Sequence, residues 1–192
     1  MRTLVVYCHP DPASFTAATR DRVLAALATR GDDVRLTDLY GEGFDPLFTA
    51  QERRDHLRPG PDPPLARYAE DLQWCRRLIL VYPTWWSGQP AMLKGWVDRV
   101  WVNGVAWDLP AGANRIRARL HNVRRIVAVT SHGSSKLTNA LEGEVGKRLV
   151  TRTLRALCHP LTRTKWIALY DIDTASDEQR HAFLDRVERS AR

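Results

Sequence analysis

Short, continuously apolar runs alternate along the chain with longer segments in which apolar residues recur every three or four positions. A parallel strand that is buried on both faces gives an unbroken apolar run, and residues 4–8 form such a run. In the second strand we expect Val34, Leu36 and Leu39 to face inward. The predicted strands are residues 4–8, 33–38, 78–82, 126–130 and 166–170.

The segments between these strands have the periodicity of helices with one buried side. Gly31 follows the first helix as a stop signal, Pro90 suits the first position of the third, and Ser176 suits the N-cap of the last. The predicted helices are residues 14–30, 65–77, 90–103, 137–157 and 176–189.

The third predicted helix carries the clearest apolar stripe. Its members follow the i, i+3, i+4, i+7, i+8 spacing of a helix with one buried face. They are Leu93, Trp96, Val97, Val100 and Trp101. This spacing favours a place in the core or at a subunit interface over a ligand-binding role for the stripe.

Strands that alternate with helices predict a doubly wound α/β fold around an all-parallel sheet. The length of 192 residues predicts one domain that spans residues 1–192. Residues 41–64 are rich in Gly and Pro and predict a long irregular excursion with one helical turn near residues 50–54. A loop of this length is typically functional or mobile. We favour that over a linker, because the first half has too few strands to close a core.

The formal charge of +7 comes almost wholly from arginine, since lysine stands only at positions 94, 136, 147 and 165. The arginines are spread along the chain, with no cluster larger than a pair. This pattern favours a solvated basic surface over a nucleic-acid interface, which would need clustering and a recognisable motif. The net charge still helps to attract anionic ligands such as nucleotides.

Three cysteines, Cys8, Cys75 and Cys158, are widely separated and form neither a CxxC pair nor a metal spacing with histidine. We therefore predict reduced thiols, a cytoplasmic protein and no metal site. The N-terminal segment lacks the pattern of a secretory signal, and no apolar run approaches the length of a membrane span. We expect no membrane insertion.

The loop that follows the first strand is the first of three with candidate chemistry, because ligands of open α/β sheets bind outside the carboxyl ends of the strands. Here His9, Ser14 and Thr16 lie close to the free N–H groups of a helix start, which suits a phosphate. A simple N-cap by Ser14 explains the same residues. Neither a G-x-G-x-x-G nor a G-x-x-x-x-G-K-[ST] motif occurs here.

The second loop, after the third strand, carries Trp85 and Trp86, whose flat rings suit a planar ligand. The alternative is that both rings only cover the core. The third loop, Thr-Ser-His-Gly-Ser-Ser-Lys at residues 130–136, could donate hydrogen bonds to the polar edge of a ring. Ordinary turn chemistry explains that loop nearly as well.

Two stretches resemble a known family. They are Val-Val-Tyr-Cys-His-Pro-Asp-Pro-Ala-Ser-Phe-Thr near the start and Tyr-Pro-Thr-Trp-Trp-Ser-Gly-Gln-Pro-Ala-Met-Leu-Lys-Gly-Trp-Val-Asp-Arg-Val at residues 82–100. Both are similar to the flavodoxin-like NAD(P)H:quinone oxidoreductases, a family that includes ancillary subunits of potassium efflux systems. The resemblance runs from residue 2 to about residue 135. It implies a five-stranded sheet of order 2-1-3-4-5 with helices on both faces, and a homodimer.

The resemblance also implies a bound flavin, FMN or FAD, with NAD(P)H as the co-substrate. His9, Ser14, Phe15 and Thr16 would hold its phosphate end. The residues that would run along the isoalloxazine ring are Pro83, Thr84, Trp85, Trp86 and Ser87. Its pyrimidine edge would be reached by Thr130, Ser131, His132 and Gly133. Trp107 would line the substrate pocket of the neighbouring subunit.

The implied reaction passes a hydride from NAD(P)H through the flavin to a quinone or a similar small acceptor. In the mammalian-type enzymes a tyrosine and a histidine assist the transfer, but residues 135–147 contain neither. The asparagine that is common where Thr16 stands is also absent. His132 is therefore the best-placed candidate for a general acid.

Two other classes of function remain open. A flavodoxin-type electron carrier would tend to be acidic and to carry a Ser/Thr/Gly-rich phosphate loop, whereas this chain is basic and has His-Pro there. A regulatory flavoprotein could use the excursion at residues 41–64 to dock on a transporter or another partner.

Overall fold

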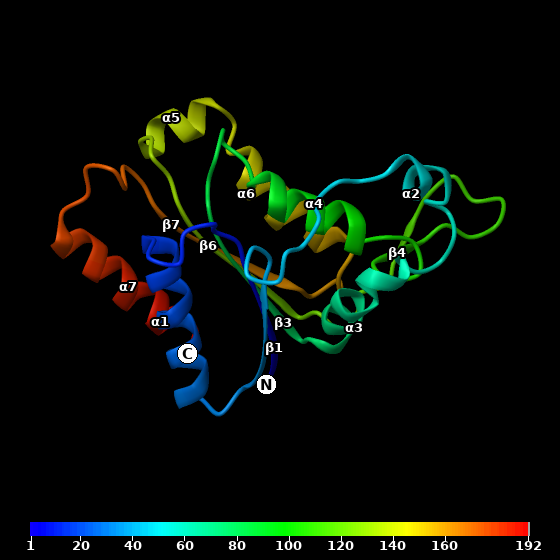
Figure 1. Cartoon of the computed structure of the whole chain (residues 1–192), viewed down its shortest axis with the longest axis horizontal. Helices are drawn as coiled ribbons and strands as arrows, with labels where there is room; N and C mark the ends of the chain where they lie inside the picture. The colour runs from blue at the N-terminus through cyan, green and yellow to red at the C-terminus, as the bar shows by residue number, and fades with distance from the viewer. Residues whose placement is uncertain (192) are drawn as a thin grey trace.

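The computed structural model describes residues 1–191 and is built around one parallel sheet of five strands (Figure 1). The strand order is β2-β1-β3-β6-β7, which is the predicted 2-1-3-4-5 order once the two short strands β4 and β5 are set aside. All four pairings in this sheet are parallel. The strands are β1 (Arg2–Tyr7), β2 (Asp33–Asp38), β3 (Arg77–Pro83), β6 (Arg125–Ser131) and β7 (Arg163–Leu169).

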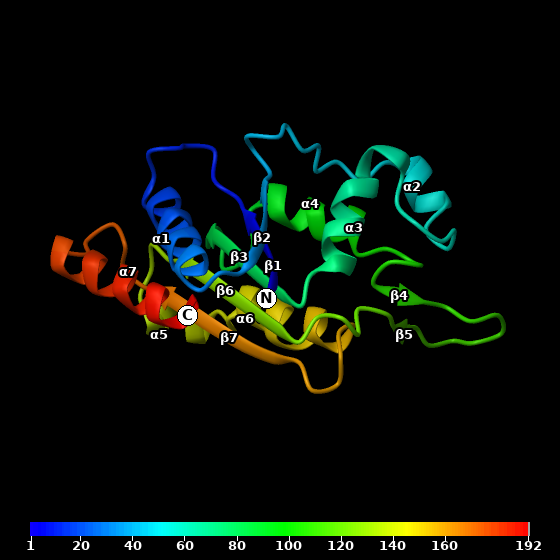
Figure 2. The same cartoon turned by 90° about the horizontal axis from the view of Figure 1, so that it is seen from below.

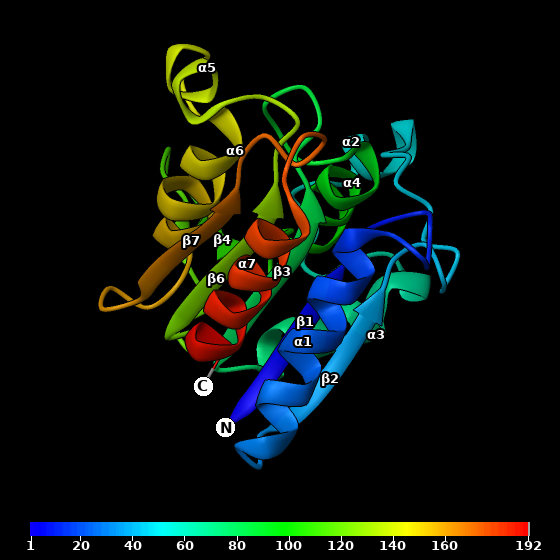
Figure 3. The same ribbon diagram turned by 90° about the vertical axis from the view of Figure 1, so that its left-hand side faces the viewer.

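Helices cover both faces of the sheet, and side chains that alternate along the strands divide the core in two. On one face, shown in Figure 3, α1 (Phe15–Thr29) and α7 (Asp177–Ala191) lie side by side across Val5, Ile79 and Val127. On the other face, Leu4, Leu78 and Ile126 belong to the larger cluster. The helices α3 (Ala66–Trp74) and α4 (Ala91–Val100) contribute to that cluster. The apolar stripe of α4 is buried, as predicted.

The predicted helix at residues 137–157 is wrong, because the structure breaks it into three pieces. These are α5 (Lys136–Leu141), α6 (Val145–Arg148) and the π-helical segment η2 (Leu149–Leu154). The break lies at Gly143 and Glu144, whose φ angles of +86° and +47° are left-handed. Glycine reaches this region without strain, so the chain can turn here between α5 and α6.

Two smaller expectations also need correction, and one small sheet was not predicted. Leu36 is 41% exposed, because β2 is an edge strand that pairs only with β1. The predicted helix at residues 65–77 ends at Trp74, and Arg77 is already the first residue of β3. The segment after α4 holds a small antiparallel sheet of β4 (Trp107–Asp108) and β5 (Arg117–Ala118), seen at the margin in Figure 2.

The excursion at residues 41–64 is clamped to one side of α4 and its C-terminal extension. It contains α2 (Ala50–Arg54), the predicted helical turn, and leads into the 3-10 turn η1 (Pro63–Leu65). A Cβ at Gly95 would lie 2.4 Å from Pro46, so only glycine allows this approach. Arg99 donates to the Glu52 carboxylate at 2.7 Å, and Gly60 N–H donates to the Asn103 carbonyl at 2.8 Å. Gly95 and Arg99 lie on one face of α4, and Asn103 follows the end of that helix, so contacts along its whole length fix the excursion.

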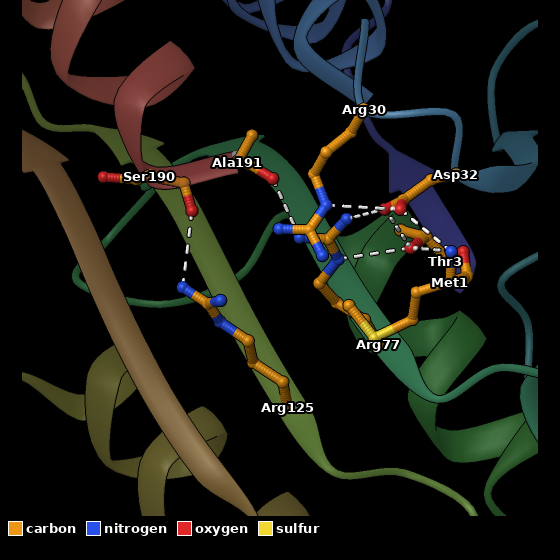
Figure 4. Close-up of polar contacts among 8 residues, drawn as sticks. All are labelled: Met1, Thr3, Arg30, Asp32, Arg77, Arg125, Ser190 and Ala191. Atoms are coloured by element: carbon orange, nitrogen blue, oxygen red, sulfur yellow. Dashed lines mark hydrogen bonds and ion pairs between the residues drawn. The ribbon is translucent and has the colours of Figure 1, made fainter. Parts of the chain in front are cut away.

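A buried ionic network closes the amino end of the sheet (Figure 4). Arg77 has no exposed side-chain surface and forms an ion pair with Asp32. Its Nε donates to the Thr3 hydroxyl at 3.1 Å, and its Nη1 donates to the Ala191 carbonyl at 2.8 Å. One side chain therefore joins β1, β3, the turn before β2 and the end of α7.

The Asp32 carboxyl titrates abnormally in this network. Burial alone raises its pKa, but the N-terminal ammonium, Arg77 and Arg30 outweigh burial and hold the pKa below its usual range. A carboxyl whose pKa is lowered by folding stabilises the protein above its unfolded pKa. That contribution is lost as the pH falls through the folded pKa.

Among the helices formed by residues 1–191, none has the length and apolar character that crossing a membrane requires.

We predict that Arg77→Met lowers the free energy of unfolding by about 3–5 kcal/mol, because it leaves the buried Asp32 carboxylate and the Ala191 carbonyl without the guanidinium that binds both. The neighbouring Arg76 is exposed, and Arg76→Met is the matched control with an expected change within about 0.5 kcal/mol. Urea unfolding measures both. Equal effects of the two substitutions would show that the buried pair does not matter.

We also predict that all three cysteines resist alkylation in the native protein at pH 8. Burial raises the pKa of Cys8, Cys75 and Cys158 to about 12 in each case, so almost no thiolate is present. Mass spectrometry after iodoacetamide treatment should show no adduct in buffer and three adducts in urea. Rapid labelling of Cys8 in buffer would contradict its buried position.

Candidate functional site

A cavity of about 640 Å³ opens where β1, β3 and β6 reach their carboxyl ends. It lies at the point where the three predicted loops meet, which is the expected place for a ligand in an open α/β sheet. Nearly all the predicted site residues line it: His9, Ser14, Phe15, Thr16, Pro83, Thr84, Trp85, Trp86, Ser87, Ser131, His132 and Gly133. Thr130 lies just beneath this lining and is only 3% exposed.

The first loop places the start of α1 at one end of the cavity. The Ser14 hydroxyl accepts the Ala17 N–H at 3.1 Å, so Ser14 is the N-cap of this helix. The first N–H groups of a helix have no intrahelical acceptor, and those of Phe15 and Thr16 lie at this edge of the cavity. Capping and ligand binding are therefore compatible, and a phosphate would find N–H donors and the positive end of the helix here.

The second loop makes a tight two-residue turn that pushes Trp86 out of the protein. Trp85 and Gly88 exchange backbone hydrogen bonds of 3.2 and 3.1 Å. Trp86 and Ser87 between them have φ angles of +48° and +58°, in the left-handed region that non-glycine residues rarely adopt. The Trp86 side chain is wholly exposed, so the alternative that it covers the core is wrong. Strained backbone of this kind persists only where its surroundings hold it, and it gathers at binding sites.

The segment after the break at Gly143 supplies that support. Gly146 N–H donates to the Ser87 carbonyl at 2.9 Å, and the Gln89 amide donates to the Gly146 carbonyl at 2.9 Å. The Ser87 hydroxyl also donates to the Glu142 carboxylate. These contacts explain why a continuous helix at residues 137–157 is not formed, since α6 must turn back to hold the tryptophan turn.

The third loop buries His132 at the floor of the cavity, with only 5% of its surface exposed. Its ring stacks on Tyr170, with centroids 4.6 Å apart, and its Nδ1 lies 2.7 Å from the Asn139 side-chain oxygen. Burial lowers the pKa of His132, and Asn139, Glu144 and Glu142 only partly oppose that effect. His132 is therefore a neutral imidazole at neutral pH.

Four residues that line the cavity were not predicted from the sequence: Asn139, Glu142, Ile172 and Asp173. The last two follow β7, whose carboxyl end lies beside that of β6, so the predicted strand order was a signal for them. Asn139 and Glu142 lie on one side of α5, and nothing in the sequence motifs marked them.

Trp107 lies away from this cavity. It lines a second one of about 390 Å³ together with Trp101, Leu149 and Leu157, and its indole N–H donates to the Trp101 carbonyl at 2.9 Å. Within one chain the structure does not bring Trp107 to the other predicted site residues. Its predicted role in a neighbouring subunit stays a prediction.

The lining offers hydroxyls, backbone amides, a neutral imidazole and exposed aromatic rings. Cys8, at the end of β1, is buried, and burial raises the pKa of its thiol to about 12, so it is no nucleophile. Among residues 1–191 no three His, Cys, Asp or Glu side chains are arranged to hold a metal ion. Such a site suits a flat ligand with an anionic tail that is held by dipoles and stacking.

Comparisons with known proteins agree with this geometry. The chain is 34% identical over 108 residues to the uncharacterized NAD(P)H oxidoreductase YcaK of Escherichia coli, which covers 55% of each chain. It is 25% identical over 153 residues to NAD(P)H dehydrogenase [quinone] 1 of Cavia porcellus, covering 71% of this chain and 55% of that one. The matched regions thus span little more than half the length of these curated relatives.

Solved structures match over the full length. The crystal structure of Smu.1420 from Streptococcus mutans superposes with a TM-score of 0.86 at 30% identity, covering 100% of this chain and 99% of that one. The NAD(P)H:quinone oxidoreductase of Methanothermobacter marburgensis gives a TM-score of 0.85 at 21% identity, covering 100% and 98%, and this shows a shared fold. A model of the family described as flavodoxin-like fold matches residues 1–190, and the chain belongs to that family.

Proposed function

We propose that this protein is a flavin-dependent oxidoreductase that passes a hydride from NAD(P)H, through a bound flavin, to a quinone or a similar small acceptor. The observation that carries this proposal is the cavity at the carboxyl edge of the sheet. It joins a free helix start, an exposed tryptophan turn and a polar floor in one site. These three parts match the phosphate, the ring and the polar edge of a flavin.

Relatives support the reaction class. The relatives named above include an NAD(P)H oxidoreductase and an NAD(P)H dehydrogenase [quinone], and a third, from Pongo abelii, is a ribosyldihydronicotinamide dehydrogenase [quinone] at 27% identity. All three names give a dihydronicotinamide as the compound that is oxidised. We take the flavin as FMN or FAD.

The residues present fit a flavin. The N–H groups at the start of α1 would hold a phosphate, and the exposed Trp86 ring offers a face for stacking. The flavin supplies the hydride chemistry when it is bound. The protein orients it, and backbone groups of the third loop near His132 would stabilise the negative charge that reduction places on its polar edge.

We also propose a homodimer in which Trp107 reaches the site of the neighbouring subunit. The second cavity supports this, because Trp101, Trp107 and Leu157 give it an apolar wall. The excursion at residues 41–64 forms another part of its wall and is held there by Arg99 and Asn103. A fixed excursion fits a subunit contact better than a mobile docking loop. The three buried free cysteines support a cytoplasmic location.

We predict that the purified protein binds FMN or FAD and, once loaded, oxidises NADH or NADPH in the presence of a benzoquinone. The rate should exceed that of the same concentration of free flavin by at least about tenfold, because the site orients the reacting rings. Stopped-flow absorbance at 340 and 450 nm measures both half-reactions. A protein that binds flavin but is reduced no faster than free flavin would be an electron carrier instead.

We predict that Trp86→Ala weakens flavin binding about tenfold, because it removes a stacking surface. The free energy of unfolding should stay unchanged, since this side chain is wholly exposed. Leu161→Ala is the control, because Leu161 is 76% exposed and lies outside the cavity lining. Fluorescence titration gives the affinity, and unchanged affinity in Trp86→Ala would remove Trp86 from the site.

A further inference from the structure

The orientation of the Asn139 side chain is fixed by its surroundings. Its Nδ2 lies 2.8 Å from the Ser135 carbonyl and 2.9 Å from the Ser134 hydroxyl. A carbonyl oxygen only accepts hydrogen bonds, so the nitrogen of the amide must face it. The Asn139 oxygen is therefore the atom that lies 2.7 Å from His132 Nδ1.

This orientation in turn fixes the tautomer of His132. An amide oxygen only accepts, so His132 Nδ1 must carry the proton and donate it. Because burial keeps the ring neutral, Nε2 then has no proton and is a hydrogen-bond acceptor. The Thr84 hydroxyl lies 3.4 Å from Nε2.

The tautomer of His132 in turn sets the direction of the hydrogen bond between the Thr84 and Thr130 hydroxyls at the cavity floor. Thr84 and Thr130 share a hydrogen bond of 2.9 Å that either could donate. If Thr130 donates to Thr84, the Thr84 proton is free for His132 Nε2, a buried acceptor that would otherwise lack a donor. If Thr84 donated to Thr130 instead, the Thr130 proton would go to the Ser131 carbonyl at 3.4 Å. That carbonyl already accepts the Thr84 N–H at 2.7 Å.

We propose that Asn139 is a positioning residue for the flavin site. By fixing the tautomer of His132, it makes the Thr84 oxygen a hydrogen-bond acceptor toward the cavity. This oxygen recognises the N3–H of the flavin. The proposal rests on the proposed function. The polar edge of an oxidised isoalloxazine carries one N–H between two carbonyls. A hydroxyl whose proton is turned away toward His132 complements that N–H and disfavours a carbonyl in its place.

The first test uses the protein without added ligand, labelled with 15N-histidine. Long-range 1H–15N spectra at pH 7.5 distinguish the two tautomers, and the Nε2 shift reports whether it accepts a hydrogen bond. We expect His132 to be the Nδ1–H tautomer with a hydrogen-bonded Nε2. An Nε2–H tautomer, or an equal mixture of both, would overturn the proposal.

Two substitutions separate positioning from general packing. Asn139→Leu should release the Nδ1–H preference, because it removes the oxygen that accepts from Nδ1. Thr84→Val should leave the tautomer unchanged and move the Nε2 shift to its unbonded value. Leu137→Ala, an exposed change on the same helix, is the control and should alter nothing. If Asn139→Leu does not fold, Thr84→Val still decides, and an unmoved Nε2 shift in that variant would contradict the proposed hydrogen-bond direction.

The second test compares FMN with N3-methyl-FMN. Wild-type protein should bind the methylated ligand at least about tenfold more weakly than FMN, the effect of one lost hydrogen bond. Thr84→Val should bind both within about threefold of each other, and full discrimination by Thr84→Val would overturn the N3–H contact. If wild-type protein binds no flavin, the proposed function and this contact both fail, while the hydrogen-bond direction read from the spectra stands on its own.

Discussion

The rest of the molecule depends on one constraint, which is that five strands run parallel and therefore end at the same edge. Backbone groups, loop residues and helix starts converge there beyond the last strand pairings, and a cavity forms at that edge. The opposite edge must then be closed by other means. Arg77 closes it with a buried charge that joins two strands, the turn before β2 and the end of α7. The buried ion pair fixes the amino ends of the strands, and the loops at their carboxyl ends can carry strained turns.

The strain at the open end is balanced by local contacts rather than by the core. The left-handed pair Trp86 and Ser87 is held by Gly146, which is itself bound by Gln89, and Gly146 comes close because the chain turns at Gly143. The same segment begins with α5, which carries Asn139 to His132. One break in a predicted helix thus supports both the aromatic turn and the polar floor of the cavity. A longer regular helix would hold neither in place.

Much of this arrangement could be predicted from the sequence, since apolar runs gave the strands and their parallel order placed three loops together. The helical turn at residues 50–54 also agrees with α2. The features that were missed depend on tertiary contacts that leave no periodic signal. Leu36 lies outward because β2 is an edge strand, and Arg77 is buried because Asp32 comes close from another turn. Asn139 reads as an ordinary helix residue until the fold places it against His132.

Charge acts on two length scales in this molecule. The chain carries a formal charge of +7, yet the lining of the large cavity contains no lysine or arginine and includes Glu142 and Asp173. The excess of arginine therefore attracts anions from a distance but does not pair with them in the site. A bound phosphate would depend on the N–H groups and dipole of α1, which hold an anion without a mobile side chain. The polar floor follows the same principle, because a neutral imidazole and two hydroxyls would orient a bound ring through hydrogen-bond direction rather than through charge.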